Sequence, residues 1–140
     1  DITKVSGTSM EPAIKDGSTV FINKVAYGIV KPFGDSLLCT WKEPQKGDIV
    51  IYIHNNKPVI KRVVATEFEQ ITYSTENGYW LFVNDIKIPL TEAQYQRIKY
   101  DSFVPENTVL CVGDNYLDSV DSRDYGFVFV ESIFGKVLCR

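Results

Sequence analysis

The apolar residues of this chain come in short runs interrupted by frequent turn-forming residues. Runs of about four to eight residues, rich in β-branched and aromatic side chains and bounded by Gly, Asn, Asp or Pro, are typical of β-strands. No apolar stripe with helical spacing is longer than three turns. We therefore expect an all-β protein with short helices. The predicted strands are Ser18–Asn23, Asp48–Ile53, Pro58–Thr66, Glu69–Ser74, Trp80–Val83, Val109–Val112 and Gly126–Val130.

Turn and helix signals lie between these strands. The segment His54–Lys57 has the length of a hairpin loop, and both Asn77–Gly78 and Asn84–Asp85 favour turns because these residue types tolerate positive φ. Two short helices are predicted. Met10–Lys15 begins beside Pro12, and proline is favourable in a first helical turn; Thr91–Ile98 begins with Thr91 as an N-cap.

Composition narrows the function classes. A chain of 140 residues with 44% hydrophobic side chains fits one globular domain. Lys and Arg number 15 against 18 Asp and Glu, which gives a net charge of −3 and argues against a nucleic-acid partner. No apolar run approaches the ~20 residues of a membrane-spanning helix.

Histidine and cysteine are scarce. The three cysteines, Cys39, Cys111 and Cys139, are far apart in the sequence, so we expect neither a zinc ribbon nor a CxxC redox site. No cofactor is expected. The odd number leaves at least one thiol free, and the pairing of the others stays open. A Ser-His-Asp triad would need His54, which lies in a hairpin tip with nothing nearby to orient it.

Strand alternation draws attention to Lys61. Side chains alternate between the two faces of a strand, so Val59, Lys61 and Val63 share one face. If that face is buried, desolvation lowers the lysine pKa and the neutral amine can act as a base. If the strand lies at an edge, the lysine extends to solvent instead. The pattern alone leaves both interpretations open.

Two polar segments could carry chemistry. In Val5–Pro12, Gly7 allows an unusual turn, and Ser9 could expose its hydroxyl beside backbone N–H groups, as an oxyanion hole requires; the alternative is a helix cap in a loop. In Val112–Gly126, Asp121 and Arg123 could pair. A calcium loop or a solvated turn are the alternatives there, although the acidic spacing does not fit an EF-hand.

Four motifs in sequence order resemble those of the bacterial type I signal peptidases, and their spacing agrees from Val5 to about Val130. The matching segments are Ser6–Pro12, similar to the nucleophile box; Gly47–Tyr52; Val59–Val64, similar to the lysine box; Gly113–Asn115 followed by Asp121–Arg123 and Gly126–Phe127; and, as a further stretch, Asn23–Gly28 through Lys31–Phe33. The family's Pro-Gly-Asp after the lysine strand is absent and is replaced by Val64–Phe68.

The resemblance implies a signal-peptidase-like or LexA-like folded β-sheet domain with a Ser–Lys dyad. Ser9 would be the nucleophile and Lys61 the general base, with Ser119 hydrogen-bonded to the lysine. Asp121 and Arg123 match a structural ion pair. The Ser9 N–H would be one oxyanion donor. Many members have a serine as the second donor, where this chain has Gly7, so a backbone group there or a water molecule would take that part.

The resemblance also implies a substrate and a location. The substrates would be secreted precursors with small residues at the first and third positions before the cut, as in Ala-X-Ala. Residues 1–140 would be the single soluble catalytic domain, on the extracytoplasmic face of the bacterial plasma membrane, held by an anchor outside this chain and by apolar strands near the site. The positions matching the family's substrate pocket are Val5, Met10, Ile14, Val20, Ile51, Val59 and Ile60.

Three other assignments compete with this one. LexA-type self-cleaving repressors share the Ser–Lys dyad and similar motifs, but no helix-turn-helix or internal cleavage site is evident here. A conjugative-transfer peptidase is a closer cousin. A catalytically weak relative acting in pilus assembly is the non-enzymatic alternative, and the retention of Ser9 and Lys61 argues against it.

Overall fold

Antiparallel β-sheets make up most of the computed structural model, which describes residues 1–30, 37–40 and 42–138. The predicted Lys31–Phe33 motif and Cys139 lie outside the described residues. The largest sheet has seven strands, in the spatial order β1 (Ile2–Lys4), β2 (Thr19–Asn23), β12 (Gly135–Leu138), β5 (Ile49–His54), β6 (Lys57–Thr66), β10 (Thr108–Val112) and β11 (Val128–Phe129).

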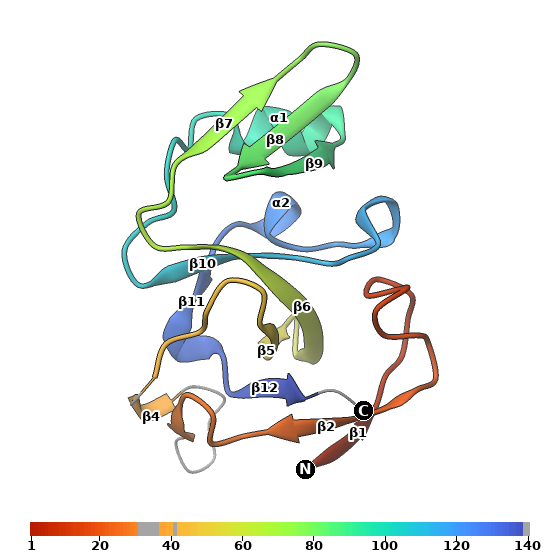
Figure 1. Cartoon of the computed structure of the whole chain (residues 1–140), viewed down its shortest axis with the longest axis vertical. Helices are drawn as coiled ribbons and strands as arrows, with labels where there is room; N and C mark the ends of the chain where they lie inside the picture. Colours follow the sequence, from red (N-terminus) through yellow and green to blue (C-terminus); the bar gives the residue numbers. More distant parts are fainter. Residues whose placement is uncertain (31–36, 41, 139–140) are drawn as a thin grey trace.

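Two smaller sheets complete the β-structure. β3 (Gly28–Val30) pairs with β4 (Leu37–Thr40), and a three-stranded sheet consists of β7 (Ile71–Ser74), β8 (Tyr79–Val83) and β9 (Ile86–Leu90). The three-stranded sheet and α1 (Glu92–Ile98) lie at one end of the molecule, and β1, β2 and β12 at the other (Figure 1). Between these ends are β10 and α2 (Ser122–Tyr125). Short 3-10 turns occur at Tyr116–Asp118 (η1) and Val130–Ser132 (η2).

The all-β prediction is confirmed. Each of the seven predicted strands is present, and their ends differ from the prediction by no more than two residues. The hairpin predictions also hold, because Asn55 and Asn56, with φ of 51° and 62°, join β5 to β6. Such a two-residue turn with positive φ matches the twist of the strands that it joins. Asn77 and Asn84 likewise adopt positive φ between successive strands of the small sheet.

One helix prediction is confirmed and the other is wrong. Thr91 caps α1 with a capping box to Gln94, as its sequence indicates. Residues 10–15 form turns instead of a helix, although the Ile14 N–H donates to the Met10 carbonyl at 2.9 Å. The cause is tertiary: β1 and β2 are paired with each other, so the connection between them must leave one strand and return to its neighbour. The sequence patterns also missed five short strands and α2.

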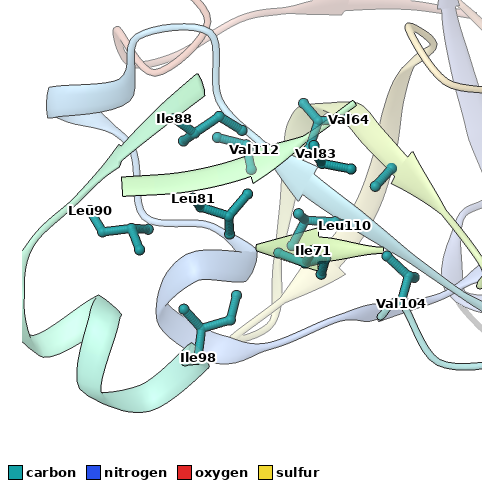
Figure 2. Packing of buried hydrophobic residues seen from close by; sticks show 11 residues of the cluster. Val64, Ile71, Leu81, Val83, Ile88, Leu90, Ile98, Val104, Leu110 and Val112 are labelled. Atoms are coloured by element: carbon teal, nitrogen blue, oxygen red, sulfur yellow. The ribbon is translucent and has the colours of Figure 1, made fainter. Parts of the chain in front are cut away.

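The longest strand, β6, links the two main parts of the fold. Its residues 57–62 pair with β5, and residues 62–66 pair with β10. At its far end, Val64 and Ala65 join Leu110 and Val112 of β10 in an apolar cluster with the small sheet and α1 (Figure 2). The strand therefore fixes the small sheet against the seven-stranded sheet and carries Lys61 close to the point where its partner changes.

No helix in the described part of the chain is long and apolar enough to cross a membrane.

Candidate active site

The site is centred on a contact between two residues far apart in sequence. Lys61 of β6 donates a hydrogen bond from Nζ to Ser9 Oγ at 2.8 Å. Ser9 lies in the turns that follow β1, in a segment whose base is closed by hydrogen bonds from Val5 N–H to the Ser18 carbonyl and from Gly17 N–H to the Val5 carbonyl. The serine hydroxyl therefore stands directly before the amine that could accept its proton.

Burial favours the neutral form of the Lys61 amine, which is the form that can act as a base. Its side chain is 5% exposed. Val63, on the same face of the strand, belongs to an apolar cluster that includes Tyr52 and Cys111, and Val59 packs against this cluster. Loss of hydration lowers the Lys61 pKa below its ordinary value, while the charge of Asp121 works in the opposite direction. The structure thus decides between the two interpretations of this strand, because the lysine is buried rather than extended into solvent.

A buried ion pair supports the polar loop that faces the Ser9 segment. Arg123 Nε and Nη2 each lie 2.9 Å from an oxygen of Asp121, and the two side chains are 1% and 0% exposed. Arg123 also donates to three carbonyls of neighbouring segments, at Pro89, Tyr116 and Ser119. This pairing holds the polar loop that connects β10 to α2 against the small sheet.

Ser119 lies in this loop but contacts Asp121 instead of the lysine. Its hydroxyl donates to Asp121 Oδ2 at 2.6 Å. Among the described residues, the Lys61 side-chain amine hydrogen-bonds only to Ser9, so the expected hydrogen bond between Ser119 and Lys61 is not formed here. A Cβ on Gly113 would lie 2.2 Å from Ser119 Oγ and 2.6 Å from the Ser9 carbonyl oxygen. Ser119 is therefore close to the Ser9 segment, and Gly113 is the residue that lets them approach.

Of the two backbone N–H groups considered as oxyanion donors, one is already hydrogen-bonded in this structure and the other is not. The Gly7 N–H donates to the Asp16 carboxylate at 2.9 Å, so it is already occupied and does not fill the predicted role. The backbone N–H of Ser9 has no acceptor among the described residues. It is thus available to a negatively charged oxygen that forms beside Ser9 Oγ.

A cleft of about 330 Å³ runs from Ser9 and Lys61 between β1 and the first half of β6. Five of the seven predicted pocket residues line it: Val5, Met10, Ile51, Val59 and Ile60. Ile14 and Val20 do not line it. They are 4% and 1% exposed and belong to the apolar core that also contains Val5 and Met10. The remaining lining residues, beside Ser9 and Lys61, were not predicted and are Thr3, Lys4, Ser6, Lys57 and Pro58.

The sequence patterns also missed a second ion pair that ties the lysine strand to the polar loop. Arg62 Nε and Nη2 bind the two oxygens of Asp114 at 2.8 and 2.9 Å. Arg62 Nη1 donates to the Gly47 carbonyl. The signal for it was present, because Arg62 follows the lysine directly and Asp114 stands in the Gly113–Asn115 motif.

The residues considered for other chemistries, a histidine and a set of carboxylates, are engaged in separate contacts in this structure. His54 stacks on Tyr125 with ring centroids 3.7 Å apart. The carboxylates proposed for a calcium loop are engaged separately: Asp114 with Arg62, Asp121 with Arg123, and Asp118 with the Thr8 hydroxyl. Among the described residues no group of three acidic, His or Cys side chains could hold a metal ion. Cys111 is a free buried thiol, and burial raises its pKa above its ordinary value.

A serine hydroxyl hydrogen-bonded to a buried lysine, at one end of a cleft in an antiparallel β-fold, is characteristic of serine hydrolases in which lysine replaces histidine. Comparison with known proteins gives the family. The model of the signal peptidase family, peptidase S26, matches residues 2–140, and the chain belongs to this family.

Individual relatives agree with this assignment. Signal peptidase I of Bacillus caldolyticus is 28% identical over 95% of this chain and 74% of its own length. Thylakoidal processing peptidase 1, a chloroplast protein of Arabidopsis thaliana, is 31% identical over 97% of this chain but only 40% of its own length. The crystal structure of a signal peptidase I from Enterococcus faecalis V583 superposes with a TM-score of 0.50 at 26% identity, covering 69% of this chain and 98% of that one.

The family expectation is therefore confirmed, and the chain is a serine endopeptidase of the type I signal peptidase class. The matched family is that of the signal peptidases, which favours this assignment over a LexA-type repressor.

Proposed function

We propose that this chain removes signal peptides from secreted precursor proteins, with Ser9 as the nucleophile and Lys61 as the general base. The observation that carries the proposal is the 2.8 Å hydrogen bond between Lys61 Nζ and Ser9 Oγ, made by a lysine that is 5% exposed. Both the geometry and the lowered pKa suit proton transfer from the serine to a neutral amine.

The reaction follows from this arrangement. Neutral Lys61 takes the hydroxyl proton as Ser9 Oγ bonds to the scissile carbonyl carbon, and the negative charge passes to the carbonyl oxygen near the Ser9 N–H. The carbon–nitrogen bond then breaks, and the leaving amine takes the proton from Lys61. A water molecule, deprotonated by Lys61, attacks the acyl-enzyme; the ester bond breaks and Ser9 regains its proton.

The cleft is suited to an extended peptide. β1 is the outermost strand of its sheet, and in the described structure residues 57–61 of β6 pair with β5 along one edge only. A peptide strand placed between these two edges could hydrogen-bond to either of them. Its side chains would meet the apolar floor formed by Val5, Met10 and Ile51, where limited space favours small residues such as those of Ala-X-Ala.

Supporting residues and location complete the proposal. We assign Ser119 the lysine-orienting role expected from the family, because it binds Asp121, the carboxylate whose charge acts on Lys61. Asp121 and Arg123 hold this loop in place.

The partners would be signal-peptide-bearing precursors and the membrane, with the enzyme acting on the extracytoplasmic face of the bacterial plasma membrane and anchored by a segment outside these residues.

Cleavage of a peptide that spans an Ala-X-Ala junction tests the proposal. Wild-type protein should cut it at the junction, whereas Ser9→Ala and Lys61→Ala should lose at least about 10³-fold in kcat. Lys42→Ala, which removes an exposed lysine outside the cleft, is the matched control and should cut normally. Cleavage by Ser9→Ala at the wild-type rate would reject the dyad.

A further inference from the structure

A residue of the polar loop holds the peptide bonds on both sides of the nucleophile. The backbone N–H of Asn115 donates to the Ser9 carbonyl at 2.9 Å. The Asn115 side-chain amide, through Nδ2, donates to the Thr8 carbonyl at 3.0 Å. Because the Thr8 carbonyl can only accept, it is the amide nitrogen that faces it. One residue therefore anchors the carbonyls immediately before and after the Ser9 Cα atom.

The contact with Thr8 bears directly on the oxyanion donor. The Thr8 carbonyl and the Ser9 N–H belong to the same planar peptide unit, and in a trans peptide they point in opposite directions. With its carbonyl turned toward Asn115, this unit directs the Ser9 N–H away from the polar loop. That N–H has no acceptor among the described residues.

The loop is itself fixed in position. The Asp118 N–H donates to the Asn115 carbonyl at 2.9 Å, and the Asp118 carboxylate accepts a hydrogen bond from the Thr8 hydroxyl. Behind them, Gly113 lies so close to the Ser9 carbonyl that a side chain there would collide with it. The nucleophile segment thus rests against a preorganised support, and Asn115 supplies its contact to the Thr8–Ser9 peptide unit.

We propose that Asn115 is the positioning residue of the oxyanion hole, holding the Thr8–Ser9 peptide unit so that the Ser9 N–H faces the oxygen of the tetrahedral intermediate. The inference rests on the proposed function. Asn115 does not touch the reacting atoms, and it acts through the orientation of a donor that must be aligned before the charge develops. It contributes nothing to the Lys61 amine, whose hydrogen bond is to Ser9 Oγ.

The decisive variant is Asn115→Asp. The carboxylate keeps the size of the side chain but cannot donate and repels the Thr8 carbonyl. We expect kcat on the Ala-X-Ala peptide to fall about 10- to 100-fold, somewhat less than the loss of an oxyanion donor itself. KM should stay unchanged in this variant, and the midpoint of the pH–rate profile should stay unchanged in the uncharged Asn115→Ala. The inhibition constant of a matching peptide aldehyde, whose adduct carries an oxyanion, should rise by the same factor as kcat falls.

Two further variants control for folding and charge. Asn115→Ala removes only the side-chain bond and should show the same pattern, with a smaller loss if the backbone bond to Ser9 holds the segment. Asn77→Asp makes the same chemical change at an exposed turn of the small sheet and should leave every value within twofold of wild type. Thermal unfolding identifies any variant whose loss comes from an unfolded fraction.

The outcomes separate this inference from the proposed function. A kcat within twofold of wild type in Asn115→Asp, or an aldehyde constant that does not move when kcat falls, would overturn the positioning role. So would a shifted pH midpoint in Asn115→Ala, because this variant adds no charge and the shift would place the effect on Lys61. If instead wild type does not cut the peptide, or Ser9→Ala cuts it equally well, the proposed function fails and not only the role of Asn115.

Discussion

The small sheet with α1 and the sheet that carries Lys61 are built in opposite ways. The core of the small sheet is an apolar cluster of eleven buried residues, and its strands follow one another in the chain through tight hairpins. Around the proposed catalytic pair, Ser9 and Lys61, the buried residues include Lys61 itself, Asp121 and Arg123. These groups come together from segments more than fifty residues apart in the sequence.

The difference shows which region mainly stabilises the fold and which contains buried charges that suit the proposed chemistry but cost stability. A buried apolar side chain stabilises the fold through the area that it removes from water. A buried charge costs free energy unless it is paired and hydrogen-bonded. Asp121 and Arg123 satisfy that condition. The Lys61 amine has no carboxylate partner among the described residues, and burial lowers its pKa, which favours the neutral form that the proposed mechanism needs. Four substitutions test this contrast.

The largest loss of stability is expected at the buried ion pair. Arg123→Met would leave the Asp121 carboxylate buried without its cation, and breaking such a pair typically costs about 3–5 kcal/mol. Denaturant unfolding should record this loss, and peptide cleavage should fall because the loop that carries Ser119 loses its support. The double variant Asp121→Leu with Arg123→Met should recover part of the stability but not the activity. A loss below about 1 kcal/mol in Arg123→Met would contradict the interpretation.

A cavity in the small sheet should cost about as much without touching the chemistry. Leu81 is 0% exposed within the apolar cluster, so Leu81→Ala should lower the free energy of unfolding by about 2–5 kcal/mol. At a temperature where the variant is folded, kcat/KM should stay within about twofold of wild type. A tenfold fall in kcat/KM would show that the two regions are coupled and that the contrast between them is wrong.

The capping box of α1 predicts a smaller loss. Thr91→Ala removes the side-chain acceptor for the Gln94 N–H, and the loss of such a cap costs about 1 kcal/mol. Thermal unfolding should show the decrease, and Thr91→Ser, which keeps the acceptor, should stay close to wild type. Equal melting temperatures for Thr91→Ala and Thr91→Ser would argue against the cap as the cause.

The smallest effect is expected to have the opposite sign. Because burial lowers the Lys61 pKa, the unfolded chain binds more protons than the folded one between that pKa and the ordinary lysine value. Wild-type stability should therefore rise with pH through this interval. Lys61→Met, which removes the desolvation cost, should melt at a higher temperature near neutral pH and show no such rise from this group.

Activity gives the complementary readout for Lys61. The rate of peptide cleavage by wild type should rise with pH through the lowered Lys61 pKa, because only the neutral amine accepts the Ser9 proton. Lys61→Met should be inactive at every pH. A flat rate profile between about pH 5 and 9 would contradict lysine as the base.

Local patterns predicted local structure well. Asn55 and Asn56 turn β5 into β6, and Thr91 caps α1, because both features depend on neighbouring residues only. Predictions that depended on distant partners succeeded less often. Met10–Lys15 forms turns because β1 and β2 pair on either side of it, and Ile14 faces the core instead of the cleft. Short strands such as β1 and β12 gave too little periodicity to be recognised.

The sequence by itself determined the strand-rich architecture, the hairpin turns, the family resemblance and the identities of Ser9 and Lys61 as candidate residues. Only the tertiary structure decided that Lys61 is buried, that its amine lies 2.8 Å from Ser9 Oγ, that Gly7 is occupied by Asp16, and that Asn115 holds the Thr8 carbonyl. The physical reason is that alternation and turn preferences act over a few residues. The desolvation of an amine and the orientation of a peptide unit depend on groups brought together from across the chain.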